Sequence, residues 1–188
     1  LGIPTGLQMS MITLGGMVLQ SVLNGFGVVF VAGYTAANKL YGILESASVA
    51  FGYAMTAYMG QNRGARNAAR IDAGIRAVLV LSAEFTAAIV TAMLVAGKPL
   101  LGLFLSTEEA GAADALAVAY QYLMVLMAFL FALFMLQAYR SSLQGLGEMT
   151  VPTLSGFAEM LMRMGAALVL PTFIGQSGVF FAEGAAWV

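Results

Sequence analysis

Long apolar runs, each about the length needed to cross a bilayer, constrain this chain more than any other feature. The segment AVLVLSAEFTAAIVTAMLVA at 77–96 is one of five such runs, and its only charged residue is Glu84. A spanning α-helix needs ~20 apolar residues, each rising about 1.5 Å. Only 9% of all residues are charged, against about 25% in soluble domains, so a soluble fold would lack polar side chains to cover its surface. The runs predict an all-α integral membrane protein.

The expected helices follow these runs. They cover 3–31, 36–59, 77–96, 115–139 and 151–173, and a sixth begins near 178 and is cut at 188. Strands of a membrane barrel would need ~10-residue segments of alternating polarity, whereas these runs are longer and apolar at successive positions. Asn38-Lys39 lies near the first expected junction, Lys98-Pro99 ends the third expected helix, and Pro171 with Gly175 ends the fifth. Because the chain stops inside an apolar run, we expect one domain, a six-helix bundle at 1–188, whose last helix is truncated.

Charged residues are distributed unevenly between the links. The 60–76 segment, GQNRGARNAARIDAGIR, is basic, whereas the 98–114 link is acidic; they hold Arg63, Arg66, Arg70 and Arg76, and Glu108, Glu109 and Asp114. Short loops rich in Lys and Arg stay in the cytoplasm, so we predict a multi-pass plasma-membrane protein, of the bacterial inner-membrane kind, with 60–76 inside. The spacing of the first three arginines predicts one face of an interfacial helix. That face either anchors on lipid phosphates or forms gating ion pairs with another loop.

Several classes of function are excluded by what the chain lacks. A net charge of −1 gives no indication of a nucleic-acid partner, and there is no cysteine and no histidine. No phosphate-binding loop, metal-ligand cluster or catalytic Ser-His-Asp set is present, so we expect no enzyme activity, no cofactor and no metal. An intramembrane enzyme would need a paired nucleophile and base that the chain does not offer.

Polar side chains inside the apolar runs are the candidates for function, because they are costly in hydrocarbon. Spacings of three and four residues place several of them on shared helix faces. The candidates are Gln20 with Asn24, Asn38 with Tyr41 and Glu45, and Gln137. They are predicted to line a polar cavity that contacts substrate, or else to join helices by hydrogen bonds. For Glu45, a cavity or proton role stands beside a salt bridge to Lys39.

The remaining charged residues in the apolar runs are predicted to have structural roles or to lie at the interface. Glu159 and Arg163 lie four residues apart, which predicts an ion pair within one helix. Glu84 has no evident partner in the sequence. Glu183 opens the sixth helix, where we expect an interfacial position.

Seven short motifs occur in an order that points to one family. They are LGIPTGLQMSM, LQSVLNGFG, VAGYTAANK, GQNRGARNAARIDAGIR, YRSSLQGLGEMTVP, FAEMLMR and FFAEGAAW. Together they span nearly all 188 residues, and the chain resembles the C-terminal half of a transporter of the multidrug and toxic compound extrusion (MATE) family.

The resemblance implies a twelve-helix transporter made of two six-helix bundles, related by an axis along the membrane normal. Such proteins export lipophilic or cationic organic compounds in exchange for H⁺ or Na⁺. The implied partners are the lipid bilayer, these small substrates and the N-terminal bundle of the same protein.

This chain departs from some branches of the family. Those branches carry acids in the first and fourth helices of this half, where this chain has Gln8 with Ser10 and an apolar stretch at 131–135. Gly184 also stands where proline is commoner. The resemblance therefore implies that the essential carboxylate lies in the first bundle.

Two alternatives stay open. A lipid-linked oligosaccharide flippase shares the broad architecture, but its cavity should be strongly cationic. In or beside the first five helices, the only basic residues that could reach a cavity are Lys39, Arg140 and Arg163. A non-transporting membrane subunit is the other alternative, and it would show no substrate-dependent flux.

Overall fold

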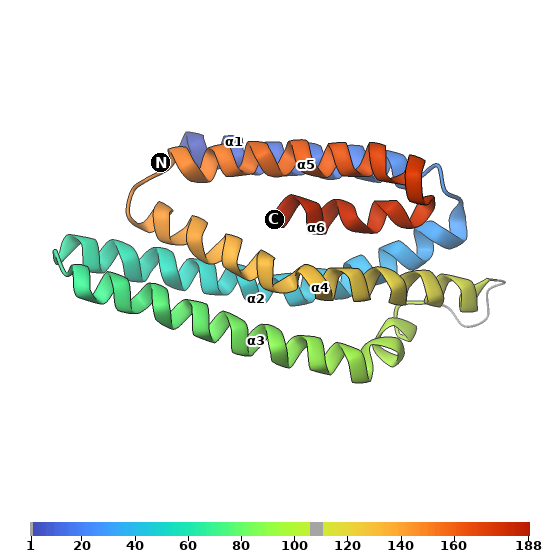
Figure 1. Cartoon of the computed structure of the whole chain (residues 1–188), viewed down its shortest axis with the longest axis horizontal. Helices are drawn as coiled ribbons and strands as arrows, with labels where there is room; N and C mark the ends of the chain where they lie inside the picture. Colours follow the sequence, from blue (N-terminus) through green and yellow to red (C-terminus); the bar gives the residue numbers. More distant parts are fainter. Residues whose placement is uncertain (1, 106–110) are drawn as a thin grey trace.

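A computed structural model describes residues 2–105 and 111–188, which are almost entirely helical (Figure 1). The elements are α1 (Gly2–Leu23), α2 (Val28–Gly64), α3 (Ala68–Gly102), α4 (Ala112–Gly145), α5 (Thr150–Ile174), a 3-10 turn η1 (Gln176–Phe180) and α6 (Phe181–Trp187). The expected all-α, six-helix architecture is confirmed for these residues. Glu108 and Glu109 of the predicted acidic link lie outside the described residues.

Four of the described helices, α1, α3, α4 and α5, are long and apolar enough to cross a membrane. Because α2, α3 and α4 contain 37, 35 and 34 residues, each rises more than about 50 Å. A bilayer's hydrocarbon core is only ~30 Å thick. The ends of these helices therefore extend into the interface, where polar residues can continue a helix without cost.

The first predicted boundary is wrong. The helix expected over 3–31 ends at Leu23, and α2 begins at Val28. Gly27 between them has a φ of 90°, a conformation that glycine adopts without strain and that no α-helix can contain. Asn38 and Lys39, which we expected near this junction, lie well inside α2 because the helix begins earlier than predicted.

The basic segment at 60–76 is mostly helical, but a turn at 65–67 divides it between α2 and α3, so the single interfacial helix that we predicted is wrong. Arg63 lies in the last turn of α2, Arg66 lies between the helices with a φ of 52°, and Arg70 lies in the first turn of α3. The Asn67 side chain caps α3 by accepting a hydrogen bond from the Arg70 backbone N–H at 3.1 Å. Because a turn separates them, the three arginines do not share one helix face.

Three other helices are also longer than predicted. The predicted 36–59, 77–96 and 115–139 helices are longer than expected at both ends, and α3 includes Pro99 in its last turn. In contrast, α5 differs from the predicted 151–173 by one residue at each end and stops at Gly175, whose φ is 69°.

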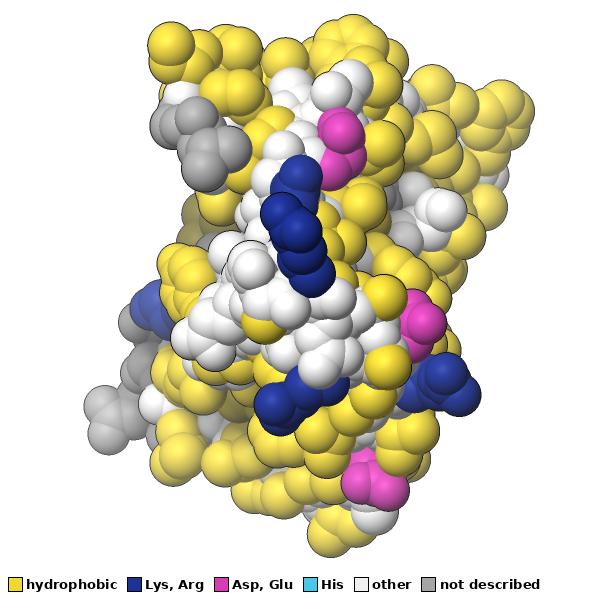
Figure 2. Space-filling model, turned by 90° about the vertical axis from the view of Figure 1, so that its left-hand side faces the viewer, with side chains coloured by type: hydrophobic (Ala, Val, Ile, Leu, Met, Phe, Trp, Pro, Cys, Tyr) yellow, Lys and Arg dark blue, Asp and Glu magenta, His cyan; other side chains and the backbone are white. Residues whose placement is uncertain are grey.

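The helices form two layers (Figure 1). In one layer α1 packs against α5, and in the other α2 packs along α4, with α3 on the outside against both. The short α6 lies between the layers and contacts α4 and α5. The N-terminal end of α1, the α2–α3 turn and the α4–α5 link all lie at one end of the bundle. Figure 2, viewed from this end, shows Lys and Arg side chains among hydrophobic ones.

Glycines allow the close contact of α2 with α4. A Cβ at Gly145 would lie 2.5 Å from the Thr56 carbonyl oxygen, and one at Gly52 would lie 2.6 Å from Ser141 Oγ. At the other end of the pair, a Cβ at Gly33 would collide with the Ala115 carbonyl oxygen. In lipid, helices associate through such small-residue contacts because no hydrophobic effect drives them together.

We expect Gly145→Ala to lower the stability of the bundle by about 1–3 kcal/mol, because its methyl group would force α4 away from α2. The measurement is the thermal unfolding midpoint in detergent. Gly42→Ala on α2 is the control, since a Cβ there meets no atom within 4 Å, and alanine favours the helix over glycine. Equal midpoints for the two variants would contradict this packing.

Candidate functional site

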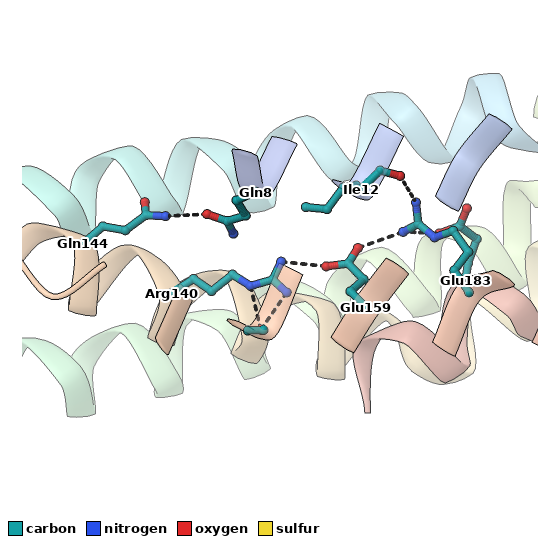
Figure 3. A network of polar contacts seen from close by, with 8 residues as sticks. Gln8, Ile12, Arg140, Gln144, Glu159 and Glu183 are labelled. Carbon is teal, nitrogen blue, oxygen red and sulfur yellow. Dashed lines mark hydrogen bonds and ion pairs between the residues drawn. The ribbon is translucent and has the colours of Figure 1, made fainter. Parts of the chain in front are cut away.

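Four charged side chains meet between the two layers and form what we call the ion-pair seam: Arg140, Glu159, Arg163 and Glu183 (Figure 3). Arg140 Nη1 of α4 lies 2.7 Å from Glu159 Oε2 of α5. The other oxygen, Glu159 Oε1, lies 2.8 Å from Arg163 Nη2 one turn along α5. Arg163 Nη2 also lies 2.9 Å from Glu183 Oε2 of α6. The seam therefore alternates in sign across three helices.

Hydrogen bonds extend the seam to α1. Arg140 donates from Nε and Nη2 to Ser155 Oγ at 3.0 and 2.7 Å. Arg163 Nη1 donates to the Ile12 carbonyl oxygen of α1 at 3.4 Å. Removing an ion from water costs several kcal/mol even after relaxation, so each of these buried charges requires partners. The two positive and two negative charges of the seam cancel.

A neutral contact continues the seam toward the end that carries the N-terminus (Figure 3). Gln144 Nε2 of α4 donates to Gln8 Oε1 of α1 at 3.1 Å. Gln8 is only 3% exposed, and its side chain packs over Gly156, where a Cβ would lie 2.6 Å from Gln8 Cγ. This pair joins α1 and α4 across the gap between the layers.

Glu45 lies beside the seam on α2. Its half-buried carboxylate contacts the Tyr41 hydroxyl and interacts electrostatically with Arg163 and Glu183. Tyr41 is buried and stacks on Trp187 of α6, with ring centroids 5.7 Å apart. No ion pair to Glu45 occurs within the described residues, and Lys39, its predicted alternative partner, is exposed.

Aromatic rings close one side of this region. Tyr34 of α2 stacks on Tyr122 of α4 with centroids 4.3 Å apart, and the two hydroxyls are joined by a 3.0 Å hydrogen bond. Phe180 stacks against both Tyr122 and Phe30. Such stacked pairs add about 0.5–1.5 kcal/mol beyond the area they bury, so they hold the start of α6 in place.

The six predicted cavity residues do not form one cluster. Tyr41 and Glu45 lie together next to the seam. Gln20 donates to Asn24 at 3.0 Å, and both are exposed near the end of α1. Asn38 is exposed on α2, and half-buried Gln137 packs on Gly52. The structure thus distributes the six residues over several separate regions of the bundle.

The charged candidates fall into two groups. The predicted contact of Glu159 with Arg163 occurs, but within a larger network than one helix. Glu183 was expected at the interface, which is wrong, because Arg163 holds it between the layers. Arg63, Arg66, Arg70 and Arg76 are exposed and form no ion pair within the described part of the chain. Arg63 lies against the α4–α5 link, since a Cβ at Gly147 would lie 2.6 Å from Arg63 Nη1.

Sequence reasoning did not identify Arg140 and Glu183 as members of one network. Their contacts with α5 join residues on different helices, and periodicity along one helix carries no information about such pairs. Charge balance is the signal that was available. Apolar helices that contain two arginines and two glutamates need to bring them together, because an unpaired charge in hydrocarbon is costly.

Comparison with known proteins gives a consistent result. A family model described as MatE matches residues 4–169. The chain is 35% identical over 123 residues to the "Probable multidrug resistance protein YpnP" of Bacillus subtilis (strain 168), covering 65% of this chain and 26% of that protein. It is 25% identical over 125 residues to the "Probable multidrug resistance protein YoeA" of the same organism, covering 66% and 26%.

A solved structure has the same fold. It is described as the outward-facing conformation of a multidrug resistance MATE family transporter of the MOP superfamily, and superposes with a TM-score of 0.88 at 23% identity. The match covers 100% of this chain and 41% of that one. For the two Bacillus relatives the matched region is 26% of their length, so this chain spans about a quarter of each.

We expect Glu159→Gln to destabilise the bundle by about 3–5 kcal/mol, because it leaves two buried arginines with one carboxylate. The free energy of unfolding in mixed micelles measures this loss. Glu84→Gln is the matched control, since Glu84 is exposed on α3 and lies outside the seam. A Glu159→Gln variant as stable as the control would show that the seam carries no stability.

Proposed function

This chain belongs to the MatE family, and we propose that the protein exports organic, often cationic, compounds in exchange for H⁺ or Na⁺ by alternating access. In this proposal the chain forms one of two six-helix bundles, and the other bundle supplies the essential carboxylate. The name of the Bacillus relative, a probable multidrug resistance protein, and the fold shared with a solved MATE transporter support this function.

The observation that supports the proposal most is an acidic side chain beside the seam, Glu45, that forms no ion pair with a basic residue in the described part of the chain. Arg140, Glu159, Arg163 and Glu183 cancel one another, whereas Glu45 is half-buried and has no basic partner within ion-pair distance in the described part. A carboxylate at low dielectric attracts a cation far more strongly than one in water. Glu45, with Tyr41 at its side, is thus suited to contact a cationic substrate.

Neutral polar groups would add contacts elsewhere on the bundle. Gln20 near the end of α1 and Asn24 in the turn that follows are exposed and share a hydrogen bond. They can exchange that bond for one to a ligand without leaving a buried group unpaired. Asn38 and Gln137 are proposed to contribute in the same way on α2 and α4.

A flippase for lipid-linked pyrophosphates fits this arrangement less well. Such a substrate needs uncompensated basic side chains. Both buried arginines, Arg140 and Arg163, are already paired with Glu159 and Glu183, and Lys39 is exposed. The polar interior of the described chain therefore favours a cation over an anion.

Exchange follows from a shift between two orientations of the bundles. A ligand moves such an equilibrium only by its difference in affinity for the two states. If H⁺ or Na⁺ favours one orientation and the organic cation favours the other, each drives the opposite movement. Protonation of Glu45 would also remove the charge that attracts the substrate, which helps release.

The test is efflux of a fluorescent organic cation such as ethidium from vesicles that contain the intact protein. We expect a pH or a Na⁺ gradient, imposed separately, to drive efflux. We expect Glu45→Gln to raise KM for the cation about tenfold, the equivalent of ~1.4 kcal/mol, because one attractive charge is lost. Glu84→Gln should match the wild type.

Two results would contradict the proposal at different levels. No efflux with either gradient would exclude a cation-coupled exporter. Gradient-driven efflux with an unchanged KM in the Glu45→Gln variant would keep the exporter and remove Glu45 from its substrate site.

A further inference from the structure

A narrow apolar groove runs between α2 and α3 on the outside of the bundle. It has a volume of about 430 Å³, and its lining includes Met55 and Tyr58 from α2 and Gly74, Ala77 and Leu81 from α3. The lining residues span 51–58 and 73–81, which corresponds to a length of about 12 Å. One leaflet of the hydrocarbon core is ~15 Å thick, so the groove follows most of a single leaflet.

The groove opens where a lipid would lie. α3 lies at one outer edge of the bundle (Figure 1), and its large side chains Val80, Leu81, Leu94 and Val95 are more than half exposed. The end of the groove at Tyr58 and Gly74 points to the arginine-rich turn, which the distribution of basic residues predicts to be cytoplasmic.

Arg70 lies on the same face of α3 as the groove. Each helical residue turns by about 100°, so Arg70, Gly74, Ala77 and Leu81 fall within a stripe about 60° wide. Arg76 lies about 120° away from Arg70. Arg70 is exposed, and none of the ion pairs within the described residues includes it.

Tyr58 fixes the mouth of the groove. Its hydroxyl donates to the Arg70 carbonyl oxygen at 2.9 Å, and its ring lies so close to Gly74 that a Cβ there would collide with it. The tyrosine hydroxyl is therefore already hydrogen-bonded, and the Arg70 guanidinium, which forms no ion pair in the described part of the chain, is available to a ligand.

We propose that this groove binds one acyl chain of an anionic phospholipid from the inner leaflet, with the head-group phosphate at Arg70. The axes of packed helices lie 8–10 Å apart, so a third helix cannot enter the space between α2 and α3. The small side chains at Gly74 and Ala77 leave room there for a single hydrocarbon chain. The basic mouth selects a negative head group and disfavours a cationic substrate. Arginine pairs well with phosphate because its planar donors match the phosphate oxygens.

The experiment is native mass spectrometry of the intact protein, delipidated in detergent and titrated with phosphatidylglycerol or phosphatidylcholine of identical acyl chains. The quantity measured is Kd of the first bound lipid. We expect tighter binding of phosphatidylglycerol. Arg70→Ala should raise its Kd about fivefold, or ~1 kcal/mol for one basic residue near an anionic surface. The Kd of phosphatidylcholine should rise less, because its choline group offsets the charge of the phosphate. Ala77→Phe should weaken both lipids by filling the groove.

Matched controls separate a site from general charge and bulk. Arg76→Ala removes an arginine of the same segment from another face, and Ala87→Phe adds the same ring at an exposed alanine of α3 outside the groove. Both should bind as the wild type does. If Ala77→Phe does not fold, Ala77→Leu takes its place.

The proposal is overturned if the two lipids bind equally well to the wild type, or if Arg76→Ala weakens binding as much as Arg70→Ala. An unchanged Kd in a folded Ala77 variant would likewise exclude the groove as the acyl-chain site. Transport need not change in any of these variants, so the outcome is independent of the proposed function.

Discussion

The bundle depends on one carboxylate that two arginines share. Glu159 forms an ion pair with Arg140 of α4 through one oxygen and with Arg163 of its own helix through the other. Arg163 in turn reaches Glu183 of α6 and the backbone of α1. Between apolar layers, the cost of burying each ion is offset only if all the partners are in place. The positions of four helices are therefore tied to the geometry of this one side chain.

The two faces of α2 connect the seam to the proposed sites. Tyr41 and Glu45 face the region between the layers, beside the seam and α6. Further along the helix, Met55 and Tyr58 face the outer groove against α3. The two regions are about 20 Å apart along one rigid helix, from Glu45 to Tyr58 at 1.5 Å per residue. A movement of α2 against α4 would therefore alter both the substrate region and the lipid groove.

The sequence predicted the fold well where hydrophobicity alone decides it. Continuous apolar runs lead to spanning helices, and α5, bounded by polar turns and Gly175, was correct to within one residue. The other boundaries failed because polar residues outside the hydrocarbon continue a helix, as at 60–64 in α2. A single glycine conformation at Gly27 ended α1 early. The pairing of Arg140 with Glu159 depends on which helices become neighbours, and spacing within a helix does not encode it.

The central claim is that Arg140 and Glu159 act as a unit, and a double-mutant cycle tests it most directly. The quantities are the unfolding free energies of Arg140→Met, Glu159→Met and the double variant in mixed micelles. Removing both leaves the neutral pair of Arg163 with Glu183, so the double variant should lose less stability than Glu159→Met alone. The expected coupling energy is about 1–3 kcal/mol. Losses that add to within ~0.5 kcal/mol would contradict the account.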